Sequence, residues 1–215
     1  MTKPETSPTL VLGVNGREGL ELLEDAIAIE ISVGRKDEEI SWILPKSLLI
    51  HHSEFFNAAL NGTFAESGSR SMTMPEDNPM AFRLLVQWLY IGDIKIDDVD
   101  AWLEAWVLGD KIGNTAFRDY AMTKLVDYYH DFAITTTTVA IAYQKSVLGS
   151  QLRKWALDQF LFHSNSGDLY FFADDWVSVL ETETEFIADI AKATILFKGG
   201  KVEDPHARLD SYLEE

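Results

Sequence analysis

Residues 71–93 read SMTMPEDNPMAFRLLVQWLYIGD, and the fold prediction starts from this stretch. Ser71–Met74 has the length and character of a short strand. Asn78 is a good N-cap, and Pro79 suits the first helical position because its missing N–H is tolerated there. The next apolar residues recur at i, i+3, i+4 and i+7, the spacing of one helix face. They are Phe82, Leu85, Val86 and Leu89. The stretch therefore predicts a strand, then a helix that ends near Gly92.

A hairpin and two short helices are predicted upstream of this stretch. Residues 27–33 (IAIEISV) alternate apolar and polar side chains, which indicates a half-buried strand. Residues 40–44 (ISWIL) follow a charged turn and form the second strand of the hairpin. Pro45 opens a short helix and Ser53 caps the next one. Farther upstream, residues 9–14 (TLVLGV) form a β-type run that a turn signal closes.

The chain beyond residue 98 is predicted to be helical. Helices are expected at 98–109, at 115–129, from near 138, from near 150 and at 169–180. The last helix is expected to open with the capping-box pattern Thr182-x-x-Glu185 and to end at Gly199-Gly200, with residues 201–215 frayed. Four tryptophans occupy apolar helical positions, where a core role is commoner than a binding role. They are Trp102, Trp106, Trp155 and Trp176.

The composition excludes several kinds of protein. The 215 residues include 18 basic and 35 acidic side chains, a net charge of −17, so the chain has no electrostatic reason to bind a nucleic-acid backbone. It contains no cysteine, which excludes disulfides, thiolate zinc sites and thiol nucleophiles. No apolar run approaches the ~20 residues of a membrane span, and no signal peptide is visible. We therefore expect a cytoplasmic or nuclear protein without membrane contact.

The charge is distributed unevenly along the chain. Residues 1–113 carry 19 acidic and 9 basic residues, a net charge of −10, and residues 168–215 carry 12 and 4, a net charge of −8. Residues 114–167 carry 4 acidic and 5 basic residues, a net charge of +1. The two acidic parts can simply be solvated surface. Alternatively, the near-neutral middle is buried or forms an interface.

No catalytic or metal-binding motif is found. His51 and His52 are adjacent, so on a helix they point in different directions and cannot chelate together. His130-Asp131 resembles a metal-binding dipeptide but lacks a second such pair, and a polar helix terminus explains it better. The chain has no phosphate-binding loop, dinucleotide fingerprint or nucleophile elbow. We therefore predict no catalytic residue, cofactor or metal, with an enzyme that uses an unrecognised carboxylate site as the alternative.

Residues 27–129 resemble the BTB/POZ domain. The segments that carry the likeness are IAIEISVG followed by ISWILPKSLLIHHSEFF, and MTMPEDNPMAFRLLVQWLYIGDI. Pro45 stands where the family often has a histidine. The resemblance implies an α/β (α+β) fold with a small sheet flanked by helices, followed by a helical extension. In style the chain is similar to small BTB proteins common in fungi.

The resemblance also implies a domain organisation. Residues 1–26 form an N-terminal segment, 27–130 the BTB/POZ domain, 131–198 a helical region and 199–215 an acidic flexible tail. BTB domains commonly homodimerise, often by exchanging an N-terminal strand, and residues 9–14 are a candidate for that strand. A plain loop or an intrachain edge strand is the alternative for the same residues.

The resemblance finally implies protein partners. Some members of the family recruit the cullin scaffold of ubiquitin ligases, and Phe64-Ala65-Glu66 fits their hydrophobic-x-Glu contact motif. Tyr90 stands where the family often has a further cullin contact. We therefore predict a non-catalytic interaction module, homodimeric, with a candidate cullin surface at Phe64, Glu66 and Tyr90. The alternative is a homodimeric scaffold or transcription-related protein that binds no cullin.

Overall fold

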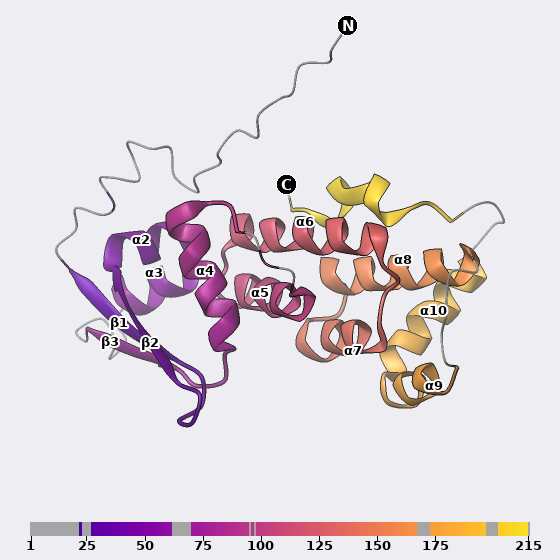
Figure 1. Ribbon diagram of the computed structural model, residues 1–215, viewed down its shortest axis with the longest axis horizontal. Coiled ribbons are helices and arrows are strands. Elements are labelled where there is room, and N and C mark those ends of the chain that lie inside the picture. The colour runs from indigo at the N-terminus through magenta and orange to yellow at the C-terminus, as the bar shows by residue number, and fades with distance from the viewer. Residues whose placement is uncertain are drawn as a thin grey trace, which may run out of the picture. The chain divides into compact units, whose positions relative to one another are not determined.

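A computed structural model describes residues 22, 27–61, 70–94, 96, 98–166, 173–196 and 202–214 (Figure 1). The chain divides into two compact units. The first, the sheet unit, takes the chain up to Asp97 together with Leu108–Phe117. The second, the helical unit, takes Asp98–Val107 and Arg118–Glu215.

The sheet unit contains a three-stranded sheet, formed by β1 (Ala28–Val33), β2 (Ile40–Pro45) and β3 (Ser71–Met74) in the order β2-β1-β3. β1 and β2 form the predicted antiparallel hairpin, in which Ile31 lies opposite Trp42. β3 pairs with β1 in parallel. The period-two pattern is confirmed, since one face of β1 is buried. Its residues are Ile29, Ile31 and Val33.

Helices α2 (Lys46–His52), α3 (Glu54–Asn61) and α4 (Pro79–Ile91) belong to the sheet unit. Both predicted N-caps are confirmed. Asn78 Oδ1 accepts hydrogen bonds from the backbone N–H groups of Met80 (2.8 Å) and Ala81 (3.3 Å). Ser53 Oγ accepts one from the N–H of Phe56 (3.1 Å) and donates one to the carbonyl of Ile112 (2.6 Å). The apolar faces of these helices fill the core of the unit with large buried side chains, among them Leu49, Phe56, Phe82 and Leu85.

Helices α5 (Val99–Lys111) and α6 (Thr115–Asp131) contribute residues to both units. The helical unit continues with α7 (Thr136–Lys145), α8 (Gln151–Ser166), α9 (Ala173–Thr182), α10 (Thr184–Leu196) and the 3₁₀ helix η2 (Pro205–Tyr212). All four tryptophans predicted to be core residues are at most 5% exposed, so the core role is confirmed. Phe186 of α10 is fully buried and packs against aromatic rings from α7, α8 and α9. These are Tyr143, Phe160 and Trp176.

Two details of the C-terminal region differ from the sequence prediction. Thr182 does not cap α10: it is the last residue of α9, and its hydroxyl donates to the carbonyl of Ser178 (3.0 Å), one turn earlier. The predicted capping box is therefore wrong. Residues 205–212 are not frayed either, because η2 buries Tyr212, whose hydroxyl donates to Asp158 of α8 (2.9 Å).

The small sheet and the many helices confirm the predicted α+β class with a helical extension. The proposed exchanged strand, residues 9–14, lies outside the described residues. Among the residues that the structure describes, no helix is both long and apolar enough to cross a membrane.

Candidate protein-interaction surfaces

The structure places one of the three predicted cullin-contact residues. Tyr90 lies near the C-terminal end of α4 with 43% of its surface exposed, and its neighbour Ile91 is 58% exposed. Partial burial raises the pKa of the Tyr90 hydroxyl, which therefore stays neutral and can donate a hydrogen bond to a partner. Phe64 and Glu66 lie outside the described residues, so whether they lie beside Tyr90 stays a prediction.

Exposed isoleucines lie on both faces of the hairpin of the sheet unit. Ile43 is 73% exposed and points to the face of the sheet that carries Glu30, its partner in the register. Ile27 and Ile40, at the two ends of the hairpin, are 44% and 47% exposed. β2 is also an edge strand of the described sheet, and edge strands can pair with a further strand. The sequence prediction missed the exposure of Ile43. The signal that could have found it is an isoleucine on the strand face that also carries the polar side chain of Ser41.

A small buried gap lies between α2, α3 and α4 in the sheet unit. Its volume is about 10 Å³, and its lining includes Leu49, His52 and Asn114. His52 Nε2 is buried without a hydrogen-bond partner among the described residues, and so is Asn114 Nδ2. Burial, and then the neighbouring His51, lower the pKa of His52 from 6.5 to about 4. Since a gap of this size is comparable to one water molecule, it cannot hold an organic ligand.

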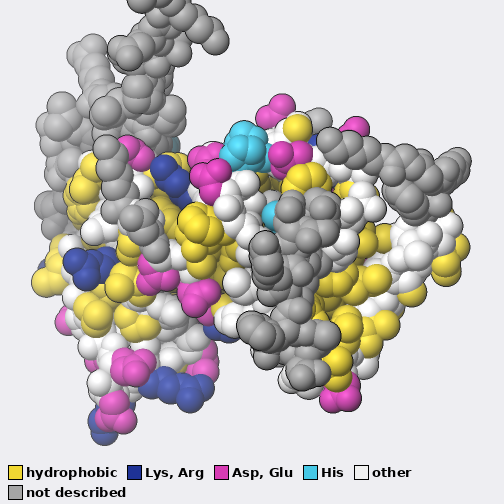
Figure 2. Space-filling view, turned by 45° about the vertical axis from the view of Figure 1, so that its right-hand side comes forward, with side chains coloured by type: hydrophobic (Ala, Val, Ile, Leu, Met, Phe, Trp, Pro, Cys, Tyr) yellow, Lys and Arg dark blue, Asp and Glu magenta, His cyan; other side chains and the backbone are white. Residues whose placement is uncertain are grey.

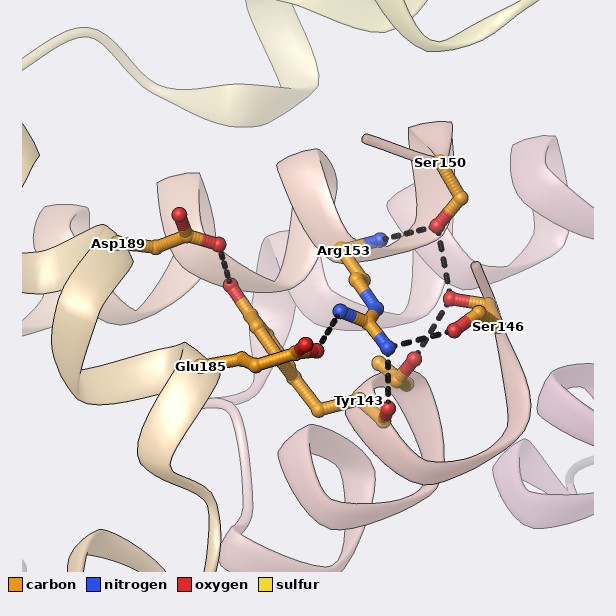
Figure 3. Close-up of polar contacts among 7 residues, drawn as sticks. Tyr143, Ser146, Ser150, Arg153, Glu185 and Asp189 are labelled. Carbon is orange, nitrogen blue, oxygen red and sulfur yellow. Dashed lines mark hydrogen bonds and ion pairs between the residues drawn. The ribbon is translucent and has the colours of Figure 1, made fainter. Parts of the chain in front are cut away.

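Arg153 of α8 forms the centre of a buried polar cluster in the helical unit (Figure 3). Its guanidinium donates to the backbone carbonyls of Tyr143 (2.6 Å) and Ser146 (2.7 Å) at the end of α7, and it pairs with Glu185 of α10. The Tyr143 hydroxyl in turn donates to Asp189, also on α10 (3.0 Å). Burial is the main reason why the pKa of Tyr143 is raised, so the hydroxyl remains a donor. The cluster therefore holds three helices together, and the contacts it makes are structural.

His130 lies beside an aspartate and a second histidine. Its Nδ1 lies 3.8 Å from an oxygen of Asp204, and its ring lies 4.3 Å from that of His206, centroid to centroid. Figure 2 shows histidine side chains with acidic neighbours at one edge of the molecule. In the part of the chain that the structure describes, no group of three or more His, Asp or Glu side chains is arranged to hold a metal ion.

The apolar groups described above that are open to a partner are exposed, whereas the polar cluster around Arg153 joins helices of the protein itself. In comparisons with known proteins, no curated protein matches the chain. The family model of the BTB/POZ domain matches residues 41–137. This range contains β3, the helices from α2 to α6 and all but the first residue of β2. It includes most of the two segments that carried the resemblance from residue 40 onward, whereas β1 lies before it. The chain therefore contains a BTB/POZ domain, matched over residues 41–137.

Proposed function

We propose that the protein is a non-catalytic homodimeric interaction module that serves as a substrate adaptor for a cullin-based ubiquitin ligase. The BTB/POZ match supports the interaction role, because this family mediates protein–protein contacts. We also propose that the domain occupies residues 27–130 and that residues 131–198 form its helical extension. A cytoplasmic or nuclear location is part of the proposal.

The exposed pair at the end of α4 carries the cullin part of the proposal. Most large apolar residues of α4 face the core, yet Tyr90 and Ile91 are 43% and 58% exposed. An aromatic ring with a neutral hydroxyl beside an aliphatic side chain is well suited to enter a partner's pocket. Phe64 and Glu66 are proposed to complete the surface, with the carboxylate fixing the orientation at its rim.

A pull-down with the N-terminal domain of a cullin tests this surface. Wild-type protein should retain the cullin fragment, and Tyr90→Ala, Phe64→Ala and Glu66→Lys should each weaken retention by about tenfold or more. Phe132→Ala is the matched control, since Phe132 is also exposed (56%) but lies in the helical unit. Wild-type protein that never retains any cullin fragment would exclude the adaptor role, and dimerisation alone would then favour the scaffold alternative.

The hairpin surface supports the homodimer. A second copy could pair a strand with β2, the edge strand of the described sheet, and pack against the exposed Ile43, as in other strand-addition contacts. The proposed strand is residues 9–14. Light scattering at several protein concentrations tests this. A dimer that a deletion of residues 1–26 or the variant Ile43→Asp converts to monomer supports the proposal, and a wild-type monomer at high concentration refutes it.

A further inference from the structure

Two adjoining hollows follow helices α8 and α10 of the helical unit. The larger has a volume of about 450 Å³ and is lined by the start of α8, the Leu148–Ser150 turn before it and the second half of α10. The smaller, of about 240 Å³, continues toward the end of α8 and reaches Val202. Ala193 of α10 lines both. We call the two hollows together the α8–α10 groove.

One face of each helix lines the α8–α10 groove. Most lining residues of α8, of the turn before it and of α10 recur at intervals of three and four, which is the spacing of a single helix face. They are Ser150 before α8, then Arg153, Lys154, Leu157, Leu161, Ser164 and Asn165 of α8, and Asp189, Lys192, Ala193, Thr194 and Leu196 of α10. The fifteen steps from Ser150 to Asn165 correspond to about 22 Å of helix. The groove is therefore long enough to receive a helix of about four turns.

The rim of the groove is unusually apolar. The five most exposed large apolar side chains in the described part of the chain are Ile195, Leu148, Ile43, Val147 and Leu196. Leu148 and Leu196 line the groove, and Val147 and Ile195 are their immediate neighbours. Figure 2 also shows hydrophobic side chains along one side of the helical unit. Exposed aliphatic side chains gathered around a hollow are typical of a surface that a partner covers.

The groove is also positively charged in a chain whose net charge is −17. Three basic side chains line it, against the single carboxylate of Asp189. Arg153 is neutralised by Glu185, and the Lys154 ammonium donates to the carbonyl of Ser211 (2.8 Å) while keeping its charge. Lys192 is exposed and has no ion-pair partner among the described residues. A local positive charge beside apolar side chains complements an acidic, apolar ligand.

We propose that the α8–α10 groove binds an amphipathic helix of a partner protein, with an apolar face toward Leu148, Leu157 and Leu196 and acidic residues toward Lys154 and Lys192. This is the helix-in-groove mode of recognition, in which apolar anchors at i, i+3, i+4 and i+7 supply affinity. The groove lies wholly within the helical unit and uses none of the residues proposed for cullin binding or dimerisation. The inference therefore stands independently of both.

A peptide titration tests the groove on the full-length protein. The probe is a fluorescein-labelled helical peptide of about four turns with leucines on one face and glutamates flanking them. A matched peptide carries lysines in place of the glutamates. Fluorescence anisotropy should show saturable binding of the glutamate peptide and binding of the lysine peptide that is weaker by about tenfold or more. Equal binding of the two peptides, or no binding of the glutamate peptide, refutes the proposal.

Variants of the groove assign the binding to its residues. Lys192→Glu and Leu196→Asp alter exposed side chains, so the fold should be retained, and each should weaken binding about tenfold or more. Leu148→Asp tests the opposite wall. The controls are Lys36→Glu, which repeats the charge reversal, and Val177→Asp, which also replaces an exposed aliphatic side chain with aspartate, both outside the groove. Circular dichroism checks folding. The proposal is refuted if the groove variants bind the glutamate peptide as tightly as the wild type does. It is also refuted if light scattering shows a dimer of the wild type that the groove variants dissociate, because the groove would then be an interface between two copies of the chain.

Discussion

The buried arginine of α8 provides the sharpest test of what holds the helical unit together. In the variant Arg153→Met, the methionine retains most of the apolar stem but removes the guanidinium. The carbonyls of Tyr143 and Ser146 then lose their donor, and Glu185 loses its ion-pair partner. We expect the helical unit to be strongly destabilised, whereas the sheet unit should be unaffected.

The size of the effect follows from the three contacts. Hydrogen bonds from a charged donor contribute ~1.5–3 kcal/mol each, so the two carbonyl bonds account for ~3–6 kcal/mol. The pair with Glu185 adds less than ~1 kcal/mol, because the Glu185 side chain is 58% exposed and solvent screens it. Arg153 Nε is buried without a partner, so removing it offsets part of the loss. We therefore expect a destabilisation of about 3 kcal/mol for Arg153→Met and less than about 1 kcal/mol for Glu185→Gln.

Hydrogen–deuterium exchange with mass spectrometry measures the effect locally, and urea unfolding measures its size. In Arg153→Met, amide protection should fall across α7, α8 and α10, while the strands and α4 remain protected. Glu185→Gln is the matched control, since it weakens only the exposed contact. The reasoning is refuted if the two variants destabilise equally, because the backbone carbonyls would then contribute nothing.

Three further predictions concern the sheet unit. Since the folded-state pKa of His52 is about 4 and its ordinary value is 6.5, its contribution to stability is fully present above pH 6.5 and is lost as the pH falls toward 4. The full pKa shift corresponds to ~3.4 kcal/mol, which partial solvent exposure reduces to about 1–2 kcal/mol. Urea unfolding of the wild type should show this loss in the free energy of unfolding, and the same pH dependence in His52→Gln would refute it. Asn78→Ala should lower the free energy of unfolding by about 1 kcal/mol, because two N–H groups of α4 lose their acceptor. Asn78→Ser should retain most of the wild-type stability, and equal stability of all three proteins would show that the cap does not stabilise α4. Gly34→Ala should cost about 2 kcal/mol in thermal unfolding, since φ is +98° and the added Cβ would lie 2.6 Å from Pro79 Cγ; an unchanged melting temperature would contradict this strain.

Most of the sheet unit could be predicted from the sequence because its signals are local. The alternation in residues 27–33, the caps Asn78 and Ser53 and the helical period of α4 each depend on neighbours a few residues away. The core role of the tryptophans was predictable for the same reason. The capping box was not, because Thr182 suits either the end of one helix or the start of the next, and only the packing of α9 and α10 selects between them.

The candidate surfaces were predictable only in part. Tyr90 was found through its family motif, whereas Ile43 and the α8–α10 groove were missed. A lone isoleucine in a strand and basic residues scattered along two helices look ordinary in a sequence. Only their exposure and their convergence on one surface distinguish them.

The sequence by itself determined the order of the strands and helices along the chain and the N-caps of α3 and α4, because backbone preferences and hydrophobic periods act over short distances. Its motifs also indicated the family. The tertiary structure alone decided which polar groups meet. Arg153 and Glu185 are 32 residues apart in the chain, and Tyr143 and Asp189 are 46 apart. No local pattern links such pairs, since they depend on how three amphipathic helices pack. The same packing leaves Leu148, Lys192 and Leu196 exposed around one groove, the site that we propose for a partner helix.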